Sequence, residues 1–312
     1  MENSFILGGR LDIGITQISA AKLVAGQPCF GTSDQKITFQ EWIKKDETYL
    51  IFGAASGAAE LLRIQKEFNL KYVIFQTENL KSLCFSDSVM MGASYKALLK
   101  QNLVLDWSSY NAKLMKEKYD IDVAGTFMFE FPRRETDLTD EEKKEYRAAV
   151  ANDNTGYDFL LGVIDDDANR DIDLFFCGAR NDARQAELDK IFENRNGKRC
   201  YWELSYTLCA PQSLNELLLR SKFVLNIPYY DDAPLATHRI NKALALGCQV
   251  ISPHSPDEEL DKMYADYVHF GDVHELVKNL DELPEKRGYV DFHRRIGSNV
   301  IGNSLKIIKE HG

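Results

Sequence analysis

The second half of the chain alternates short apolar runs with longer segments in which apolar residues recur every three or four positions. The short runs are typical of strands buried in a parallel sheet, and the longer spacing is typical of helices that cover such a sheet. The pattern therefore predicts an α/β domain. Its expected strands are 173–178, 199–204, 223–229, 248–252 and 267–270, and its expected helices are 183–195, 213–222, 235–246, 257–264 and 272–283.

Polar and glycine residues at the ends of these helices support the same interpretation. Ser213 and Asp257 stand where helix N-caps are expected, and Gly247 stands where a helix should end. The second half is thus predicted to be Rossmann-like, with strands and helices in regular alternation.

The first half shows a similar but less regular pattern. Strands are expected at 49–53, 71–76, 102–106 and 126–131, and helices at 58–68 and 110–118. The polar, charge-dense segment 136–170 is the expected junction, and 291–309 is an expected terminal helix. We predict an N-terminal domain over 1–150 and a C-terminal domain over 151–312 that ends in this helix. Two Rossmann-like domains in this order would face a central cleft, where open α/β folds bind ligands.

Composition narrows the function. The 312 residues are 44% hydrophobic and carry a net charge of −10, which opposes nucleic-acid binding because that binding depends on neutralising phosphates. No apolar run is long enough to span a bilayer. The first residues do not show the basic region followed by a long apolar stretch that is typical of a signal peptide, so we expect a cytoplasmic protein. Six scattered cysteines without a CxxC pair are expected to be reduced, and no histidine pattern indicates a metal site. The sequence leaves the oligomeric state open.

The segment 226–247, NIPYYDDAPLATHRINKALALG, holds the strongest candidate chemistry. It joins a strand end, a polar loop and a helix whose first turn contains His238 and Arg239. Helix N-termini bind anions through exposed N–H groups and the helix dipole, and an arginine adds a bidentate contact to phosphate. The competing interpretation is that both side chains only cap and solvate the helix.

Three segments of the second half resemble the donor-binding domain of GT-B glycosyltransferases, over about residues 171–280. They are FFCGARNDARQAEL, SKFVLNIPYYDDAPLATHRINKALALGCQVIS and YADYVHFGDVHELVKNL. The first half resembles the acceptor domain of the same family more weakly, through KYVIFQTENL and LVLDWSSYNAKLMKEKYDI. The resemblance implies a nucleotide-diphosphate-sugar as co-substrate, with no other cofactor, and an acceptor hydroxyl on a glycan or another molecule.

The resemblance also implies where the donor binds. It places Gly178, Arg180 and Arg184 beside the diphosphate or the transferred sugar, and the base near Tyr206. Asn226 and Tyr229 at the strand end would then face the phosphates. His238 and Arg239 at the helix start would face them as well.

One position departs from the family pattern. Where the family commonly has a glutamate that bonds to the donor ribose, this sequence has Lys242. Lysine has donors but no acceptor, so this ribose contact cannot form in the usual way. Three explanations stay open: the nucleotide sits differently, Lys242 binds a phosphate, or the donor site is degenerate.

An inverting reaction needs a base that deprotonates the acceptor hydroxyl, and the first domain has no histidine to supply it. Asp12, Glu78 and Asp106 are the candidates there, and Glu78 and Asp106 stand at or just after strand ends; for each, a turn or cap is the competing role. In a retaining reaction the leaving diphosphate can accept the proton instead. The run Asp165–Asp167 could be taken for a metal motif, but we discount it because it lies in an acidic junction.

Two weaker candidates complete the set. Asp231 and Asp232 could contact sugar hydroxyls or merely form a turn, and the glycine pair at 8–9 could approach a ligand. We therefore expect a metal-independent, hexosyltransferase-like glycosyltransferase of glycan biosynthesis. The alternative is a non-catalytic nucleotide or nucleotide-sugar binding protein. A Rossmann oxidoreductase ranks last, since the chain contains no GxGxxG.

Overall fold

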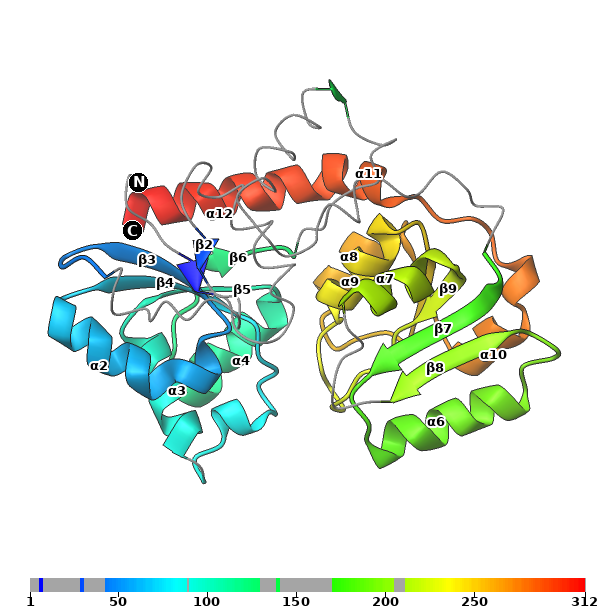
Figure 1. The fold of residues 1–312 in the computed structure, drawn as a ribbon, viewed down its shortest axis with the longest axis horizontal. Helices are drawn as coiled ribbons and strands as arrows, with labels where there is room; N and C mark the ends of the chain where they lie inside the picture. The colour runs from blue at the N-terminus through cyan, green and yellow to red at the C-terminus, as the bar shows by residue number, and fades with distance from the viewer. Residues whose placement is uncertain are drawn as a thin grey trace. The chain divides into compact units, whose positions relative to one another are not determined.

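The computed structural model describes residues 6–7, 29–30, 43–88, 90–129, 139–140, 170–204 and 211–311. The chain forms two compact units (Figure 1). Unit 1 comprises residues 1–130, 144–157 and 297–312, and unit 2 comprises residues 131–143 and 158–296. Each unit contains a parallel sheet, as the alternating pattern predicts.

Unit 1 contains a six-stranded parallel sheet in the order β2-β1-β3-β4-β5-β6. Tyr49 and Ile51 face one side, where they pack with apolar residues of the helices, and Phe52 and Phe75 stack with ring centroids 4.0 Å apart. Successive residues of β3 thus face opposite sides of the sheet, and both sides are buried. The strands are β1 (Ile6–Leu7), β2 (Cys29–Phe30), β3 (Thr48–Phe52), β4 (Lys71–Gln76), β5 (Leu103–Asp106) and β6 (Gly125–Thr126), and the helices include α2 (Ala58–Phe68), α3 (Met90–Lys100) and α4 (Ser109–Tyr119).

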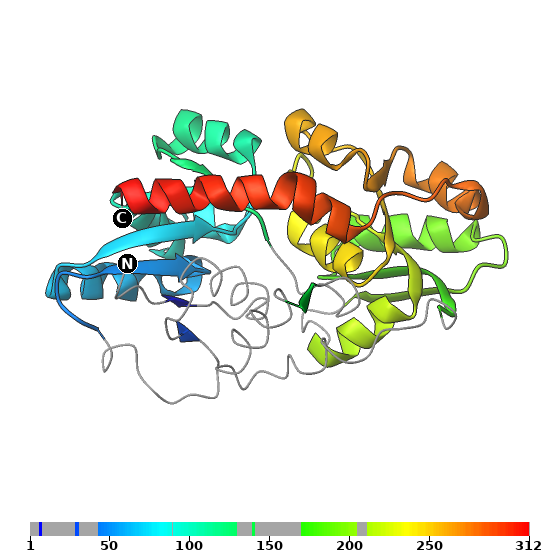
Figure 2. The same ribbon diagram turned by 90° about the horizontal axis from the view of Figure 1, so that it is seen from above.

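The terminal helix α12 (Ser298–His311) belongs to unit 1, whereas the sequence-based division assigns it to the second domain. Ser304 Oγ donates a hydrogen bond to the carbonyl of Thr126 over 2.8 Å. A Cβ at Gly125 would lie 2.3 Å from Ile307 Cδ1, so α12 approaches β6 as closely as a glycine allows. Figure 1 shows α12 on the opposite side of the sheet from α2 and α3, and Figure 2 shows α12 in front of it.

Unit 2 contains a five-stranded parallel sheet in the order β11-β10-β9-β7-β8. From β7 the chain runs to β8 on one side and then returns to β9 on the other, so the order reverses between β7 and β9. The carboxyl ends of strands flanking such a reversal form the ligand-binding crevice of open α/β sheets. The strands are β7 (Ile172–Gly178), β8 (Cys200–Leu204), β9 (Ser221–Leu225), β10 (Gln249–Ser252) and β11 (Val268–Phe270).

The helices of unit 2 cover this sheet. Leu188 of α6 and Val277 of α10 pack with Leu174, Leu225 and Ile251, which alternate along their strands with residues of the other face. The helices are α6 (Asp182–Glu193), α7 (Pro211–Leu219), α8 (Thr237–Ala245), α9 (Glu258–Tyr264) and α10 (Val273–Lys278), followed by α11 (Tyr289–Phe292).

Several predicted boundaries are wrong. Ser213 is not an N-cap, because α7 begins at Pro211, and β9 ends at Leu225 instead of continuing to 229. The strand expected at 126–131 pairs only over Gly125–Thr126 within the described residues. Asp257 does cap α9, since its Oδ1 accepts a hydrogen bond from the N–H of Leu260 over 3.0 Å. Two Rossmann-like sheets are confirmed, and the cleft expected between the domains stays a prediction.

No helix among the described residues is both long and apolar enough to cross a bilayer. The same part of the chain holds no group of three histidine, cysteine or carboxylate side chains arranged for a metal ion. The predicted metal-like run at 165–167, the candidates Asp12 and Gly8–Gly9, and most of the junction at 136–170 lie outside the described residues.

Candidate functional site

The candidate site of unit 2 lies where β7 and β9 end, at the reversal of strand order. Gly178 is the last residue of β7, and Asn226 directly follows β9. Asn226 is only 3% exposed, and its Nδ2 donates to Ser252 Oγ at the end of β10 over 2.9 Å. The buried amide thus fixes two neighbouring strand ends to each other and leaves its oxygen available for another donor.

That donor is Arg239, from the first turn of α8. Its Nη1 lies 2.8 Å from Asn226 Oδ1 and 3.3 Å from the carbonyl of Ile227. The predicted helix start and the predicted strand end therefore meet through their side chains. The contact orients a half-buried guanidinium at the carboxyl edge of the sheet, where a helix N-terminus also favours negative charge.

Gly178 is needed at this edge because side chains surround it. A Cβ on this residue would lie 2.9 Å from Arg184 Nη1, 3.1 Å from Phe176 Cζ and 3.2 Å from Arg239 Nη2. The absence of a side chain therefore lets two guanidinium groups approach the strand end. Gly178 thus lies at the carboxyl edge of the sheet, and its predicted place beside the donor stays a prediction.

Arg184 lies beside Gly178 but is buried, and its predicted donor contact stays a prediction. Its side chain is 4% exposed, and it donates to the carbonyls of Ala179 and Ile227 over 2.8 and 2.7 Å from Nη1 and Nη2. Burial, together with the positive charge of Arg239, lowers the pKa of Arg184 to about 9. Arg184 thus joins the loops that follow β7 and β9, and this buried position suits a structural role better than a donor contact.

Arg180 and Tyr229 lie in these two loops. Arg180 is exposed, two residues after Gly178. Asn181 caps α6 by accepting from the N–H of Arg184 over 2.7 Å, and its Nδ2 donates to the carbonyl of Tyr229 over 2.7 Å. The structure therefore brings Arg180, Tyr229, Asn226 and Arg239 to one edge, while Tyr206 lies outside the described residues.

Helix α8 presents basic residues on one side. His238, Arg239 and Lys242 are half-buried, whereas the other residues of the helix are buried. Thr237, the first residue of the helix, is not among the residues predicted from the sequence. Its hydroxyl is buried and has no hydrogen-bond partner among the described residues. A threonine directly before His-Arg at a helix start is the signal that could have identified it.

A second cluster lies in unit 1, at the carboxyl ends of β4 and β5. Asp106 is 0% exposed and accepts from Gln76 Nε2 over 2.9 Å and from the N–H of Ser108 over 2.9 Å. Asn111 Nδ2 also lies 3.3 Å from Asp106 Oδ1. Burial raises the pKa of Asp106 to about 7 despite these donors. Its carboxyl group therefore orders the start of α4 and is fully buried, and its predicted catalytic role stays a prediction.

Glu78 is linked to the same cluster but is partly exposed. The Gln76 side chain accepts a hydrogen bond from the N–H of Glu78 and donates to its carbonyl over 2.8 Å. Burial raises the pKa of the Glu78 carboxyl, and a hydrogen bond with Cys84 opposes this rise. The two predicted catalytic carboxylates are thus joined through Gln76, and Glu78 is the one that solvent can reach.

No protein-family model and no curated protein sequence matches the chain. The fold matches solved structures at low sequence identity. HepE from Anabaena in complex with UDP is 8% identical with a TM-score of 0.51, and the match covers 99% of this chain and 98% of HepE. HepE with UDP and glucose is 8% identical with a TM-score of 0.56 over 98% of both chains. Sucrose-phosphate synthase from Thermosynechococcus elongatus is 9% identical with a TM-score of 0.50, and the match covers 99% of this chain and 94% of the synthase. The chain therefore has the fold of the GT-B glycosyltransferases, built from two Rossmann-like units.

Proposed function

We propose that this protein is a glycosyltransferase that moves a sugar from a nucleotide-diphosphate-sugar to an acceptor hydroxyl. The observation that carries the proposal is the contact of Arg239 with Asn226 at the reversal of strand order. It holds a cation at the point of the sheet where such folds bind ligands. HepE, which has the same fold, was solved with UDP and with UDP and glucose.

The chemistry follows from the charges at this edge. In the transfer, the bond between the sugar and the diphosphate breaks, and the diphosphate leaves with the electron pair and gains negative charge. Arg239, the exposed Arg180 and the N-terminus of α8 are suited to stabilise that charge, which makes a metal ion unnecessary in the proposed reaction. Thr237 Oγ1 has a hydrogen to offer to the same anion.

Glu78 is the proposed base for an inverting reaction. Its partial exposure lets it contact an acceptor, and its raised pKa brings it closer to neutral pH, where a general base works best. Asp106 then positions the cluster through Gln76 instead of touching substrate. We propose a glycan as the acceptor class and the cytoplasm as the compartment.

The alternative is a protein of this fold that binds a nucleotide or nucleotide-sugar without turnover. Lys242, at the position where a ribose-binding glutamate is expected, favours this alternative. Turnover of a bound donor separates the two functions, because only the enzyme releases or transfers the sugar.

A thermal-shift screen with UDP, GDP, CMP and dTDP and their sugar conjugates tests the proposal. Binding to the folded state raises Tm, and we expect one nucleobase to shift the wild type. Arg239→Ala should abolish that shift, whereas Arg287→Ala, a surface arginine paired with Asp266 and Asp291, should retain it. Slow sugar release from the selected donor supports the enzyme. No shift with any nucleotide contradicts the proposal.

A further inference from the structure

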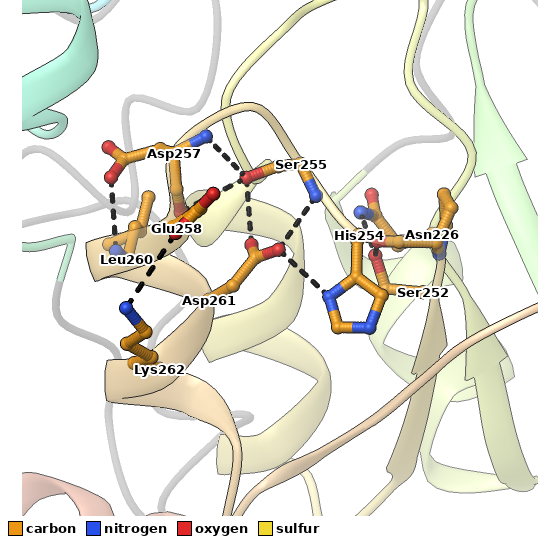
Figure 3. A network of polar contacts seen from close by, with 10 residues as sticks. Asn226, Ser252, His254, Ser255, Asp257, Glu258, Leu260, Asp261 and Lys262 are labelled. Carbon is orange, nitrogen blue, oxygen red and sulfur yellow. Dashed lines mark hydrogen bonds and ion pairs between the residues drawn. The ribbon is translucent and has the colours of Figure 1, made fainter.

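His254 lies in the loop after β10, and its imidazole is held on two sides. Its Nδ1 is 3.2 Å from Asp261 Oδ2, and its ring stacks on Phe270 with centroids 5.1 Å apart and an interplanar angle of 15°. The side chain is nevertheless 68% exposed. Figure 3 shows the second ring nitrogen directed away from Asp261. The loop thus presents an imidazole of fixed orientation.

Asp261 determines which nitrogen carries the hydrogen. Its carboxyl group is 8% exposed and accepts from the N–H of Ser255 to Oδ2 and from Ser255 Oγ to Oδ1, each over 2.7 Å (Figure 3). A carboxylate oxygen has no hydrogen to donate, so His254 Nδ1–H donates to Asp261 Oδ2. In the neutral ring, Nε2 is then a hydrogen-bond acceptor that faces outward.

Helix capping does not account for this arrangement. Asp257 already caps α9 through the N–H of Leu260. The His254 ring adds no bond to the helix backbone, because its Nδ1 contact goes to the Asp261 side chain. The imidazole is therefore oriented by Asp261 and Phe270, neither of which caps α9.

The position of His254 relates it to the candidate site of unit 2. Ser252 ends β10 and accepts from Asn226, which in turn accepts from Arg239. His254 follows Ser252 by two residues, a reach of at most about 7 Å between the Cα atoms. Because β9 and β10 are adjacent parallel strands, His254 lies at the same carboxyl edge of the sheet as Asn226, the residue that orients Arg239 (Figure 3).

We infer that His254 determines specificity for the group attached to the diphosphate: its Nε2 accepts a hydrogen bond from a hydroxyl of the transferred sugar. Asp261 and Phe270 are positioning residues that fix the tautomer and the plane of the ring. This inference rests on the proposed function and deepens it, since it separates a sugar contact at β10 from the phosphate contacts at β7 and β9.

Calorimetric titration of wild type and variants with matched ligand pairs tests the inference. The pairs are UDP with UDP-glucose, GDP with GDP-mannose and dTDP with dTDP-glucose. For the pair that binds, we expect His254→Ala to change the affinity for the nucleotide by less than about two-fold. The same variant should lower the affinity for the sugar nucleotide by roughly 3–10-fold. Asp261→Asn should weaken the sugar nucleotide by a smaller factor, and His254→Gln, which keeps an acceptor, should recover part of the loss.

His274→Ala is the matched control, because His274 is also paired with a carboxylate, Glu187, at 2.7 Å. It should leave both ligands unaffected. Equal weakening of nucleotide and sugar nucleotide by His254→Ala overturns the inference, as does no effect on either. If the wild type binds no member of any pair, the proposed function fails as well. Binding that Arg239→Ala abolishes but His254→Ala leaves intact overturns the inference alone.

Discussion

The guanidinium groups of Arg184 and Arg239 lie over the same aromatic ring: the central carbon of each is 5.4 Å from the centroid of Phe176. Arg184 is fixed by main-chain carbonyls and Arg239 by the Asn226 side chain. Two cations held this close repel each other, which contributes to the lowered pKa of Arg184. A phosphate bound at this edge would relieve that repulsion.

Gly178→Ala should weaken nucleotide binding more than it weakens the fold. The new Cβ would displace the half-buried Arg239, because Arg184 is buried and held by carbonyls. We expect about 1–3 kcal/mol of lost binding free energy and a Tm lowered by only a few degrees. Calorimetric titration and thermal unfolding measure the two effects. Unchanged nucleotide affinity would contradict the placement of the ligand at this strand end.

Lys242→Glu should weaken binding of the selected nucleotide by about ten-fold. Lys242 shares the half-buried side of α8 with His238 and Arg239, so a carboxylate there would repel a diphosphate. Lys242→Gln, which removes the charge without reversing it, should have a smaller effect. Tighter binding by the glutamate variant would instead support a ribose contact at this position.

Stability should depend on pH through Asp106. Its folded pKa of about 7 lies above the ordinary value of 3.8, so between these values the folded state holds a proton that the unfolded state has released. Stability therefore falls as the pH rises from about 4 to 7, by roughly 2–4 kcal/mol from this group. Asp106→Asn should flatten that dependence in urea unfolding at several pH values. If Asp106→Asn keeps the wild-type dependence of stability on pH, another group is responsible for the titration.

Gly125→Ala should destabilise the protein by about 1–3 kcal/mol, because its Cβ would collide with Ile307 Cδ1 of α12. Ile307→Val removes that methyl group, so the double variant should recover part of the loss. Chemical denaturation of the two single variants and the double variant gives the coupling free energy. Strictly additive effects would mean that α12 does not press on β6.

Much of the fold could be predicted because buried parallel strands give continuous apolar runs. The strand at 71–76 and the helix at 58–68 are predicted with the bounds that the structure has. Helix α3 was missed although Tyr95, Leu98 and Leu99 have helical spacing. It begins with Met90 and Met91 and contains Gly92, where a Cβ would lie 2.0 Å from the carbonyl oxygen of Ser86. This close approach to the backbone of the preceding turn requires a glycine, a poor helix former, inside the helix.

The site was predictable in part for a similar reason. Asn226 and Arg239 could be selected because a strand end and a helix start are local features. The burial of Arg184 could not be predicted, since it depends on carbonyls more than forty residues away, at Ile227 and Pro228. The paired orientation of His254 and Asp261 likewise depends on a turn of the chain and on Phe270 from another strand. Side chains that bind main-chain groups from distant segments leave no spacing pattern.

The attachment of α12 to β6 bears on how the two units can be produced separately. Most of unit 2, residues 158–296, lies in the sequence between segments of unit 1, so unit 2 interrupts unit 1 in the manner of an inserted domain. A fragment that ends at residue 150 would lose α12, whose Ile307 lies against Gly125. The apolar sheet face that α12 covers would then be exposed and prone to aggregation. Rejoining the terminal helix to the first sheet through a short linker, with the intervening domain removed, is the dissection that this connectivity favours.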